Sequence, residues 1–176
     1  MIKLKINLIF LFVLSVLINF YGCNYSFTGA SVPSHLKTVA IPIFDDRSGA
    51  GIQNLKENIT SVLVQKFTED NTLHVVEKGN ANSIIEGTIV SASEAPAQVT
   101  QSASTSGESI SANRFTIRIK IVFRDLVKKK VILETTFSGF KDYSLTGNVQ
   151  QSRQAAIDEA VKLVTEDILL GVVSNW

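Results

Sequence analysis

Hydrophobic and polar residues alternate most regularly between Arg114 and Arg124. The apolar positions are Phe115, Ile117, Ile119, Ile121 and Phe123, and the positions between them are Thr116, Arg118, Lys120, Val122 and Arg124. Successive side chains of a strand point to opposite faces, so this pattern predicts a strand with one buried face and one mainly polar face. Residues 130–140 predict a returning strand, with residues 125–129 as the turn of a hairpin. One face of the returning strand carries Val131, Leu133, Thr135 and Phe137.

Three further strands are predicted upstream, at residues 37–44, 72–77 and 83–93. The first is a short run rich in β-branched residues. Its Pro42 has no amide proton to donate, so it suits an edge position or a place where that proton would have no partner. Turn formers follow at residues 45–49 and 78–80. We interpret the Asp and Ser residues of the segment 45–49 as partners of local backbone groups in a strand-to-helix connection, in preference to a polar active site.

Two segments have the three-and-four spacing of apolar residues that is typical of an amphipathic helix. In residues 52–70 the stripe consists of Ile52, Leu55, Ile59, Val62, Leu63 and Phe67, and in residues 151–172 it consists of Ala156, Ile157, Ala160, Val161, Val164, Ile168 and Leu169. The simplest arrangement that buries these faces is an α+β fold, a two-layer α/β sandwich with both helices on one face of a mixed sheet of four to five strands.

Residues 95–112 are rich in Ser, Thr and Ala and contain few large apolar side chains. Such a segment buries too little surface to order itself, so we expect a mobile loop. The loop is either a plain connector or a segment that a partner orders. We assign Glu94 and Glu108 to this Ser-rich region as solvated carboxylates.

The first 22 residues have the layout of a secretory signal peptide, with two lysines before an apolar run. This run is shorter than the roughly 20 residues of a spanning helix. Cys23, the only cysteine, follows where a lipoprotein signal places its acylated thiol, and an incidental buried thiol is the alternative. We expect a signal peptide at 1–22, a lipidated linker at 23–36 and a single domain at 37–176. By resemblance to bacterial lipoproteins, Asn24 implies sorting to the outer membrane.

The formal net charge of +1 gives no overall field that would attract nucleic acid. His35 and His74 have no second histidine or carboxylate at metal-binding spacing, so we expect no metal site and no cofactor. The sequence also lacks a nucleophile elbow, a phosphate-cradling glycine loop and a cysteine nucleophile. We therefore predict no catalytic residues.

Six cations fall within thirteen positions, and they are the candidate ligand-binding residues: Arg118, Lys120, Arg124, Lys128, Lys129 and Lys130. Arginine and lysine pair well with phosphate, so a phosphorylated glycolipid is a sensible ligand. A solvated outer sheet face with a charged hairpin tip, which discourages edge-to-edge aggregation, is the alternative.

Several segments, in this order, resemble the lipopolysaccharide-assembly lipoprotein family LptE: residues 23–27, residues 35–44, the helix that follows, residues 83–87 (SIIEG) and residues 123–126 (FRDL). The resemblance implies a two-layer domain that plugs the lumen of the outer-membrane β-barrel LptD, assists its assembly and binds lipopolysaccharide through basic residues of the sheet. An anchor in the membrane through Cys23 is expected from the lipoprotein signal described above.

Two other classes of envelope protein stay open. One is a different lipoprotein with a similar α/β module, such as an activator of a peptidoglycan synthase or a secretion-channel component. The other is an envelope hydrolase, for which the sequence offers no catalytic constellation.

Overall fold

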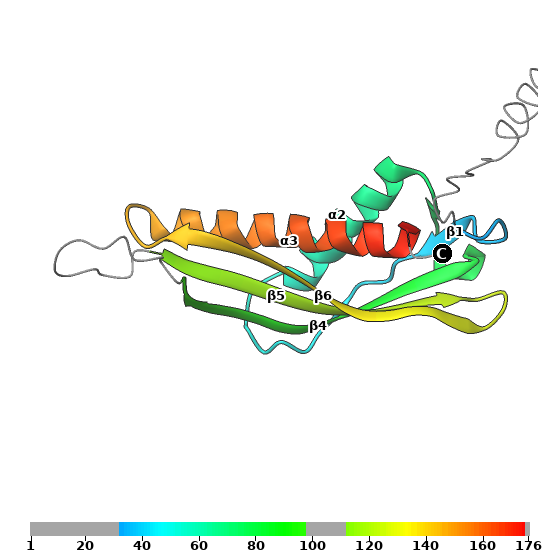
Figure 1. Cartoon of the computed structure of the whole chain (residues 1–176), viewed down its shortest axis with the longest axis horizontal. Helices are drawn as coiled ribbons and strands as arrows, with labels where there is room; N and C mark the ends of the chain where they lie inside the picture. The colour runs from blue at the N-terminus through cyan, green and yellow to red at the C-terminus, as the bar shows by residue number, and fades with distance from the viewer. Residues whose placement is uncertain (1–31, 98–111, 175–176) are drawn as a thin grey trace, which may run out of the picture.

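The computed structural model describes residues 32–97 and 112–174. Its elements are β1 (Thr38–Ala40), β2 (Asp45–Asp46), α2 (Leu55–Asp70), β3 (His74–Val75), the 3-10 turn η1 (Lys78–Asn80), β4 (Ser83–Pro96), β5 (Ala112–Asp125), β6 (Lys130–Ser144) and α3 (Val149–Ser174) (Figure 1). This succession is the predicted one with a single addition, the two-residue strand β2.

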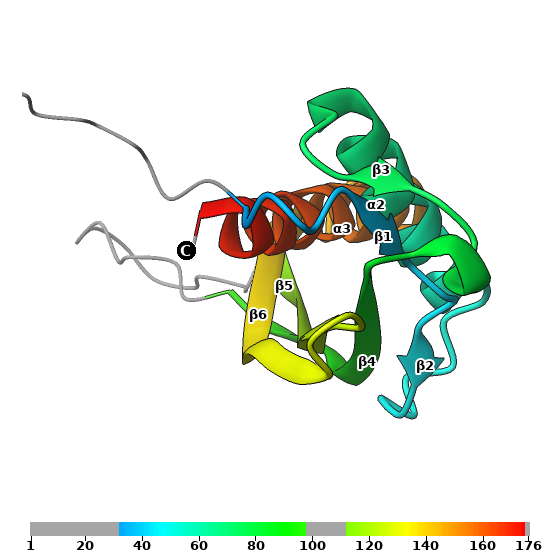
Figure 2. The same ribbon diagram turned by 90° about the vertical axis from the view of Figure 1, so that its right-hand side faces the viewer.

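The strands form one mixed sheet in the order β3-β1-β4-β5-β6, and β2 pairs with β4 outside that path. Strand β1 runs parallel to both β3 and β4, and β2 also runs parallel to β4. Strands β4, β5 and β6 form an antiparallel meander. Helices α2 and α3 lie side by side on one face of the sheet (Figure 2). The predicted α+β, two-layer fold is therefore confirmed.

The core lies between the helices and the inner face of the sheet. All five predicted apolar residues of β5 are fully buried there, from Phe115 to Phe123. They meet Leu55, Ile59, Leu63 and Phe67 of α2 and an apolar stripe of α3 centred on Ala160 and Val164. The alternation in the sequence thus identified the buried face of β5 correctly.

The predicted strand 37–44 is wrong in its second half, because β1 ends at Ala40. Pro42 lies just beyond this end, where its missing amide proton removes no sheet hydrogen bond. The amide of Phe44 then donates to Thr60 Oγ1 of α2 at 3.1 Å. The buried Phe44 ring covers Gly87 of β4, where an added Cβ would lie 2.3 Å from a ring carbon. Packing against α2 and β4 therefore replaces strand pairing here.

The three long strands extend further than predicted. Ala95 and Pro96 belong to β4 and pair with Arg114 and Asn113, and Ala112 of β5 pairs with Ser144 of β6. These positions were predicted to lie in the loop 95–112, and the rest of that loop lies outside the described residues apart from Ala97. Cross-strand pairing overrides the weak strand preference of such residues, because propensity in a sheet depends mainly on neighbours.

Val131 does not share the face of Leu133, contrary to the prediction. The register between β5 and β6 shifts between Phe123 and Arg124, so Leu133 pairs with Phe123 while Val131 pairs with Arg124. Ile132 is the extra residue of this bulge and packs against the core instead. A bulge reverses the alternation of side chains beyond it, which the sequence pattern does not show.

Candidate functional site

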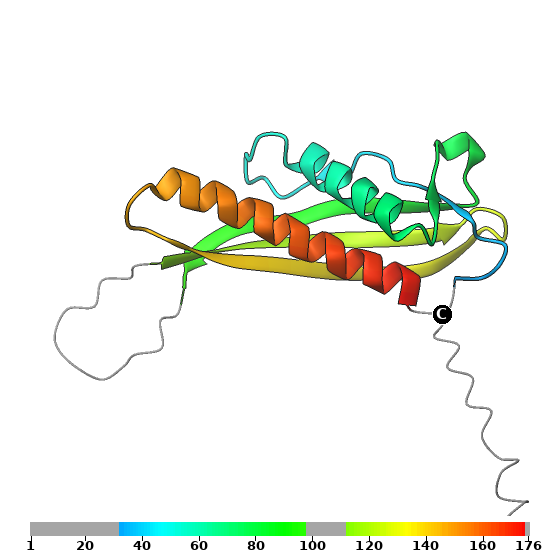
Figure 3. The same cartoon turned by 90° about the horizontal axis from the view of Figure 1, so that it is seen from above.

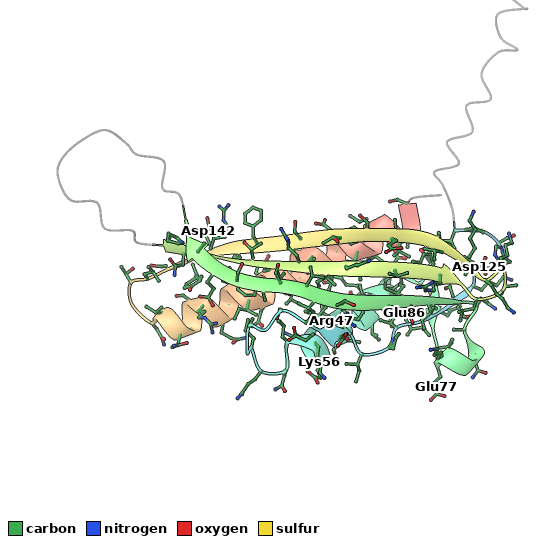
Figure 4. The ribbon with its side chains drawn as sticks, turned by 90° about the horizontal axis from the view of Figure 1, so that it is seen from below. Arg47, Lys56, Glu77, Glu86, Asp125 and Asp142 are labelled. Atoms are coloured by element: carbon green, nitrogen blue, oxygen red, sulfur yellow. The ribbon has the colours of Figure 1, made fainter. Side chains whose placement is uncertain are left out.

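The predicted strand cations lie on the outer face of the sheet, opposite the helices. Arg118, Lys120 and Arg124 are exposed, and each alternates with a buried core residue of β5. Figure 4 shows this face, with Glu86 along β4 and Asp125 and Asp142 towards opposite ends of the sheet. The structure therefore brings the three cations together on one strand face, as predicted.

Two of these three cations are engaged in ion pairs that cross to the neighbouring strands. Lys120 Nζ lies 2.7 Å from Glu134 Oε1 of β6, and Arg124 Nε lies 3.1 Å from Glu86 Oε2 of β4. The hydrogen bond from Lys120 lowers the pKa of the Glu134 carboxyl below its usual value. These pairs are about half exposed, so each contributes little to stability, and an anionic ligand could exchange with the carboxylate.

Arg118 differs from its two neighbours. In the part of the chain that the structure describes, no carboxylate pairs with its guanidinium. Its register partners are Ser91 of β4 and Ser138 of β6, which are small and uncharged. Arg118 is therefore the strand cation with the most freedom to bind a phosphate.

Sequence reasoning missed a fourth cation on this face, Arg114. Its guanidinium forms two hydrogen bonds with Asp142 of β6, at 2.6 and 3.0 Å, and lies 4.4 Å from the centre of the Phe140 ring. The hydrogen bond from Arg114 lowers the pKa of the Asp142 carboxyl. Its position four residues before Arg118 places it on the same face of a strand, and this spacing was the available signal.

The remaining predicted cations, Lys128, Lys129 and Lys130, are exposed at the tip of the β5–β6 hairpin. Asp125 fixes the tip, since its Oδ1 accepts the amides of Val127 and Lys128, both at 2.8 Å. Its other oxygen lies 2.7 Å from His35 Nε2. Burial raises the pKa of the Asp125 carboxyl, but the hydrogen bonds from His35 and the two amides outweigh burial and leave that pKa lowered.

The prediction that Glu94 is a solvated carboxylate of the Ser-rich loop is wrong, because Glu94 belongs to β4. Arg153 Nε of α3 donates to Glu94 Oε1 at 2.7 Å, and the Tyr143 hydroxyl donates to the other oxygen. The bond from Arg153 is the main reason that the pKa of the Glu94 carboxyl is lowered, whereas burial raises the pKa of Tyr143. These contacts tie the start of α3 to the sheet.

The remaining polar candidates have structural partners. Asp46 Oδ1 accepts the amide and the hydroxyl of Ser48 at 2.9 and 2.7 Å, which confirms the predicted local role of the segment 45–49. Across residues 32–97 and 112–174, no three His, Cys, Asp or Glu side chains are placed to hold a metal ion. Within the same residues no helix has the length and hydropathy to cross a bilayer. Cys23 and Glu108 lie outside the described residues.

The fold occurs in other bacterial proteins. The chain resembles the hypothetical protein CT253 from Chlamydia trachomatis (TM-score 0.57, 10% identity, covering 78% of this chain and 95% of that one). It also resembles an uncharacterized lipoprotein B from Nitrosomonas europaea (0.53, 15%, 86% and 90%) and a putative lipoprotein from Caulobacter crescentus (0.51, 8%, 79% and 90%). At these identities the likeness concerns the fold alone.

Sequence comparison identifies the family. No protein of curated function matches the chain significantly. The family described as LptE, lipopolysaccharide-assembly, in contrast matches residues 36–170, which span the sheet with its basic outer face, helix α2 and most of helix α3. The resemblance seen in the segments 35–44, 83–87 and 123–126 is thereby confirmed over most of the sequence. The chain belongs to the LptE lipopolysaccharide-assembly family.

Proposed function

We propose that this protein is an outer-membrane lipoprotein that assembles with and plugs an LptD-type β-barrel and takes part in lipopolysaccharide transport to, and insertion into, the outer membrane. The observation that carries the proposal is the family match over residues 36–170. The fold supports it, because the domain is built from a single two-layer core with a polar outer sheet face. Large membrane barrels have polar interiors, which such a face can contact without entering lipid.

The proposed anchor is Cys23, acylated after removal of residues 1–22. A lipid-modified cysteine keeps the protein at the membrane and raises its local concentration near a barrel. The domain proposed for residues 37–176 then acts at the periplasmic side of the outer membrane, with residues 23–36 as its tether.

The proposed ligand site is the basic outer face, with Arg118 at its centre. A phosphate of lipopolysaccharide would bind the guanidinium of Arg118, which has no carboxylate partner among the described residues. Lys120 and Arg124 would contribute by exchanging their carboxylates for the ligand, and Lys128, Lys129 and Lys130 complete the proposed set of cations. The exposed Phe140 ring beside Arg114 offers apolar contact on the same face.

Co-purification tests the proposed role directly. The full chain, tagged at its C-terminus and isolated from outer membranes in mild detergent, is expected to carry a stoichiometric large β-barrel. A penicillin-binding protein as the stoichiometric partner would instead support the second class of envelope lipoprotein and overturn the proposal.

Lipopolysaccharide binding tests the proposed site. Replacing Arg118 by Gln is expected to weaken binding by roughly tenfold, because a charge-assisted hydrogen bond contributes on the order of 1.5–3 kcal/mol. The matched control is Lys162→Gln, which removes an exposed cation from the helix layer. Equal binding by the wild type and Arg118→Gln would exclude Arg118 from the site.

A further inference from the structure

The chain enters the domain directly beside the tip of the β5–β6 hairpin. Val32 packs against the core and Leu36 is buried, and the amide of Leu36 donates to Pro33 O at 2.8 Å. His35 Nε2 then lies 2.7 Å from Asp125 Oδ2, the residue that holds the hairpin turn. The end of the tether is therefore docked onto the base of the tip.

Backbone hydrogen bonds connect further segments of the chain at this end of the molecule. The amide of His74 donates to Lys37 O at 2.9 Å, and the amide of Leu126 donates to Asn82 O at 2.9 Å. Strand β1, the hairpin turn and the end of α3 lie at the same end of the molecule, while α3 begins at the other end (Figures 1 and 3). We call the end that receives the tether the anchor pole, defined by Lys37, Lys78, Lys128, Lys129 and Lys130.

The anchor pole carries an excess of positive charge. All five of its lysines are exposed, and none pairs with a carboxylate within the described ranges. Asp125 is buried and bound to His35, and Glu77, which neighbours Lys78, is an exposed carboxylate at the same end. The nearby carboxylates of Glu86 and Glu134 are paired with Arg124 and Lys120. The pole therefore complements an anionic surface.

An apolar side chain projects among these lysines. Val127 is 59% exposed, next to Lys128 in a turn in which Asp125 accepts two amide hydrogen bonds. An apolar residue flanked by cations matches the chemistry of a bilayer interface, where apolar groups enter the headgroup region and lysines face the phosphates.

The length of the tether limits the distance to the membrane. Eight residues lie between Cys23 and Val32, which makes nine Cα–Cα steps, and a fully extended chain spans at most about 3.4 Å per step, so the tether reaches roughly 30 Å. We propose that the hairpin tip, Val127 to Lys130, docks on the anionic phospholipid surface in which Cys23 is anchored. The inference rests on the proposed anchor but requires neither the barrel nor lipopolysaccharide.

A fluorescent label at the tip tests the docking. Once Cys23 is acylated, the variant V127C has a single free thiol, because the chain contains no other cysteine. The full lipidated chain, labelled with a polarity-sensitive dye, is reconstituted in vesicles of phosphatidylcholine with or without phosphatidylglycerol. We expect a blue-shifted emission in the anionic vesicles only, and its loss in 1 M salt, where the Debye length is about 3 Å.

Matched variants separate docking from a general charge effect. Neutralising Lys128, Lys129 and Lys130 to Gln is expected to lower the ratio of docked to undocked tips on the order of 100-fold, since each lysine near an anionic surface contributes about 1 kcal/mol. The control triple, at the exposed Lys56, Lys141 and Lys162, removes the same charge and is expected to keep the shift. A label at Gln150→Cys, in the first turn of α3, is expected to stay in water.

Each outcome decides the inference. Intact-mass measurement of the reconstituted protein establishes acylation at Cys23 before the label is read. With acylation present, an unshifted tip label in anionic vesicles, or an equal loss of the shift in both triple variants, would overturn the docking and leave the proposed role with the barrel untouched. A chain that is not acylated at Cys23 would overturn the docking together with the proposed anchor.

Discussion

Gly139 of β6 lies directly against the backbone of α3, and replacing it by alanine is expected to destabilise the fold. A Cβ at this position would lie 2.4 Å from Ala160 O, 3.0 Å from Val164 Cβ and 3.1 Å from Val164 N. Because two of these atoms are helix backbone, no side-chain rotation relieves the clash. A carbon and a carbonyl oxygen approach to about 3.3 Å, so α3 has to retreat by roughly 1 Å.

This retreat loosens the contacts of Ala160, Val164 and Ile168 with the sheet, all of which are fully buried. A radial gap of about 1 Å forfeits up to half of the dispersion energy of each contact. We expect Gly139→Ala to lower the free energy of unfolding by about 1–3 kcal/mol, the usual range for overpacking. Without the clash, Gly139→Ala would instead raise the free energy of unfolding, because alanine in a strand interior is favoured over glycine by roughly 0.5–1 kcal/mol.

Urea unfolding of the mature chain measures this effect. With a slope of about 1–3 kcal/mol per molar urea, the midpoint is expected to fall by on the order of 1 M at an unchanged slope. The matched control is Gly79→Ala, because a Cβ at Gly79 meets nothing within 4 Å. We expect this control to stay within about 0.5 kcal/mol of the wild type. A Gly139→Ala variant as stable as the wild type would refute the close approach of α3 to β6.

Three other outcomes follow from the structure. The pKa of the Asp125 carboxyl is lowered in the fold, so its contribution to stability is present above the unfolded pKa of about 3.9. This contribution is lost as the pH falls through the lower folded pKa. Asp125→Asn is therefore expected to make the free energy of unfolding fall less steeply with decreasing pH in the acid range. An identical fall in this range would refute this. Replacing Arg153 by Met is expected to raise the pKa of Glu94, whose lowering depends mainly on that arginine, and carboxyl NMR titration measures it. Gly171→Ala is expected to cost less than Gly139→Ala in urea unfolding, because its Cβ would meet the Phe137 ring at 2.5 Å, and a side chain can move where backbone cannot.

The periodicity of the sequence was sufficient to predict the buried residues of an element wherever that element buries one regular face. The alternation in β5 located its core residues and its outer cations, and the helical stripes located Leu55 to Phe67 of α2 and the buried face of α3. Each of these patterns has a fixed period because the backbone geometry of a strand or helix is fixed. The two-layer fold followed, since two apolar helix stripes and one apolar sheet face have few ways to cover one another.

Features that depend on two distant segments were not predictable from such periods. The pairing of Lys120 with Glu134 and of Arg124 with Glu86, which leaves Arg118 as the cation of β5 without a carboxylate partner among the described residues, depends on the register of β4, β5 and β6. The bulge at Ile132 and the role of Glu94 likewise arise from contacts between strands or between β4 and α3.

By itself, the sequence determined the elements, the buried faces, the candidate anchor at Cys23 and the family resemblance, because each is written in local spacing or local motifs. Only the tertiary structure decided which cations are neutralised, that Gly139 lies against the backbone of α3, and that His35 joins the tether to the hairpin tip through Asp125. His35 and Asp125 are ninety residues apart in the chain. Their meeting reflects the packing of the whole sheet, which no local pattern encodes.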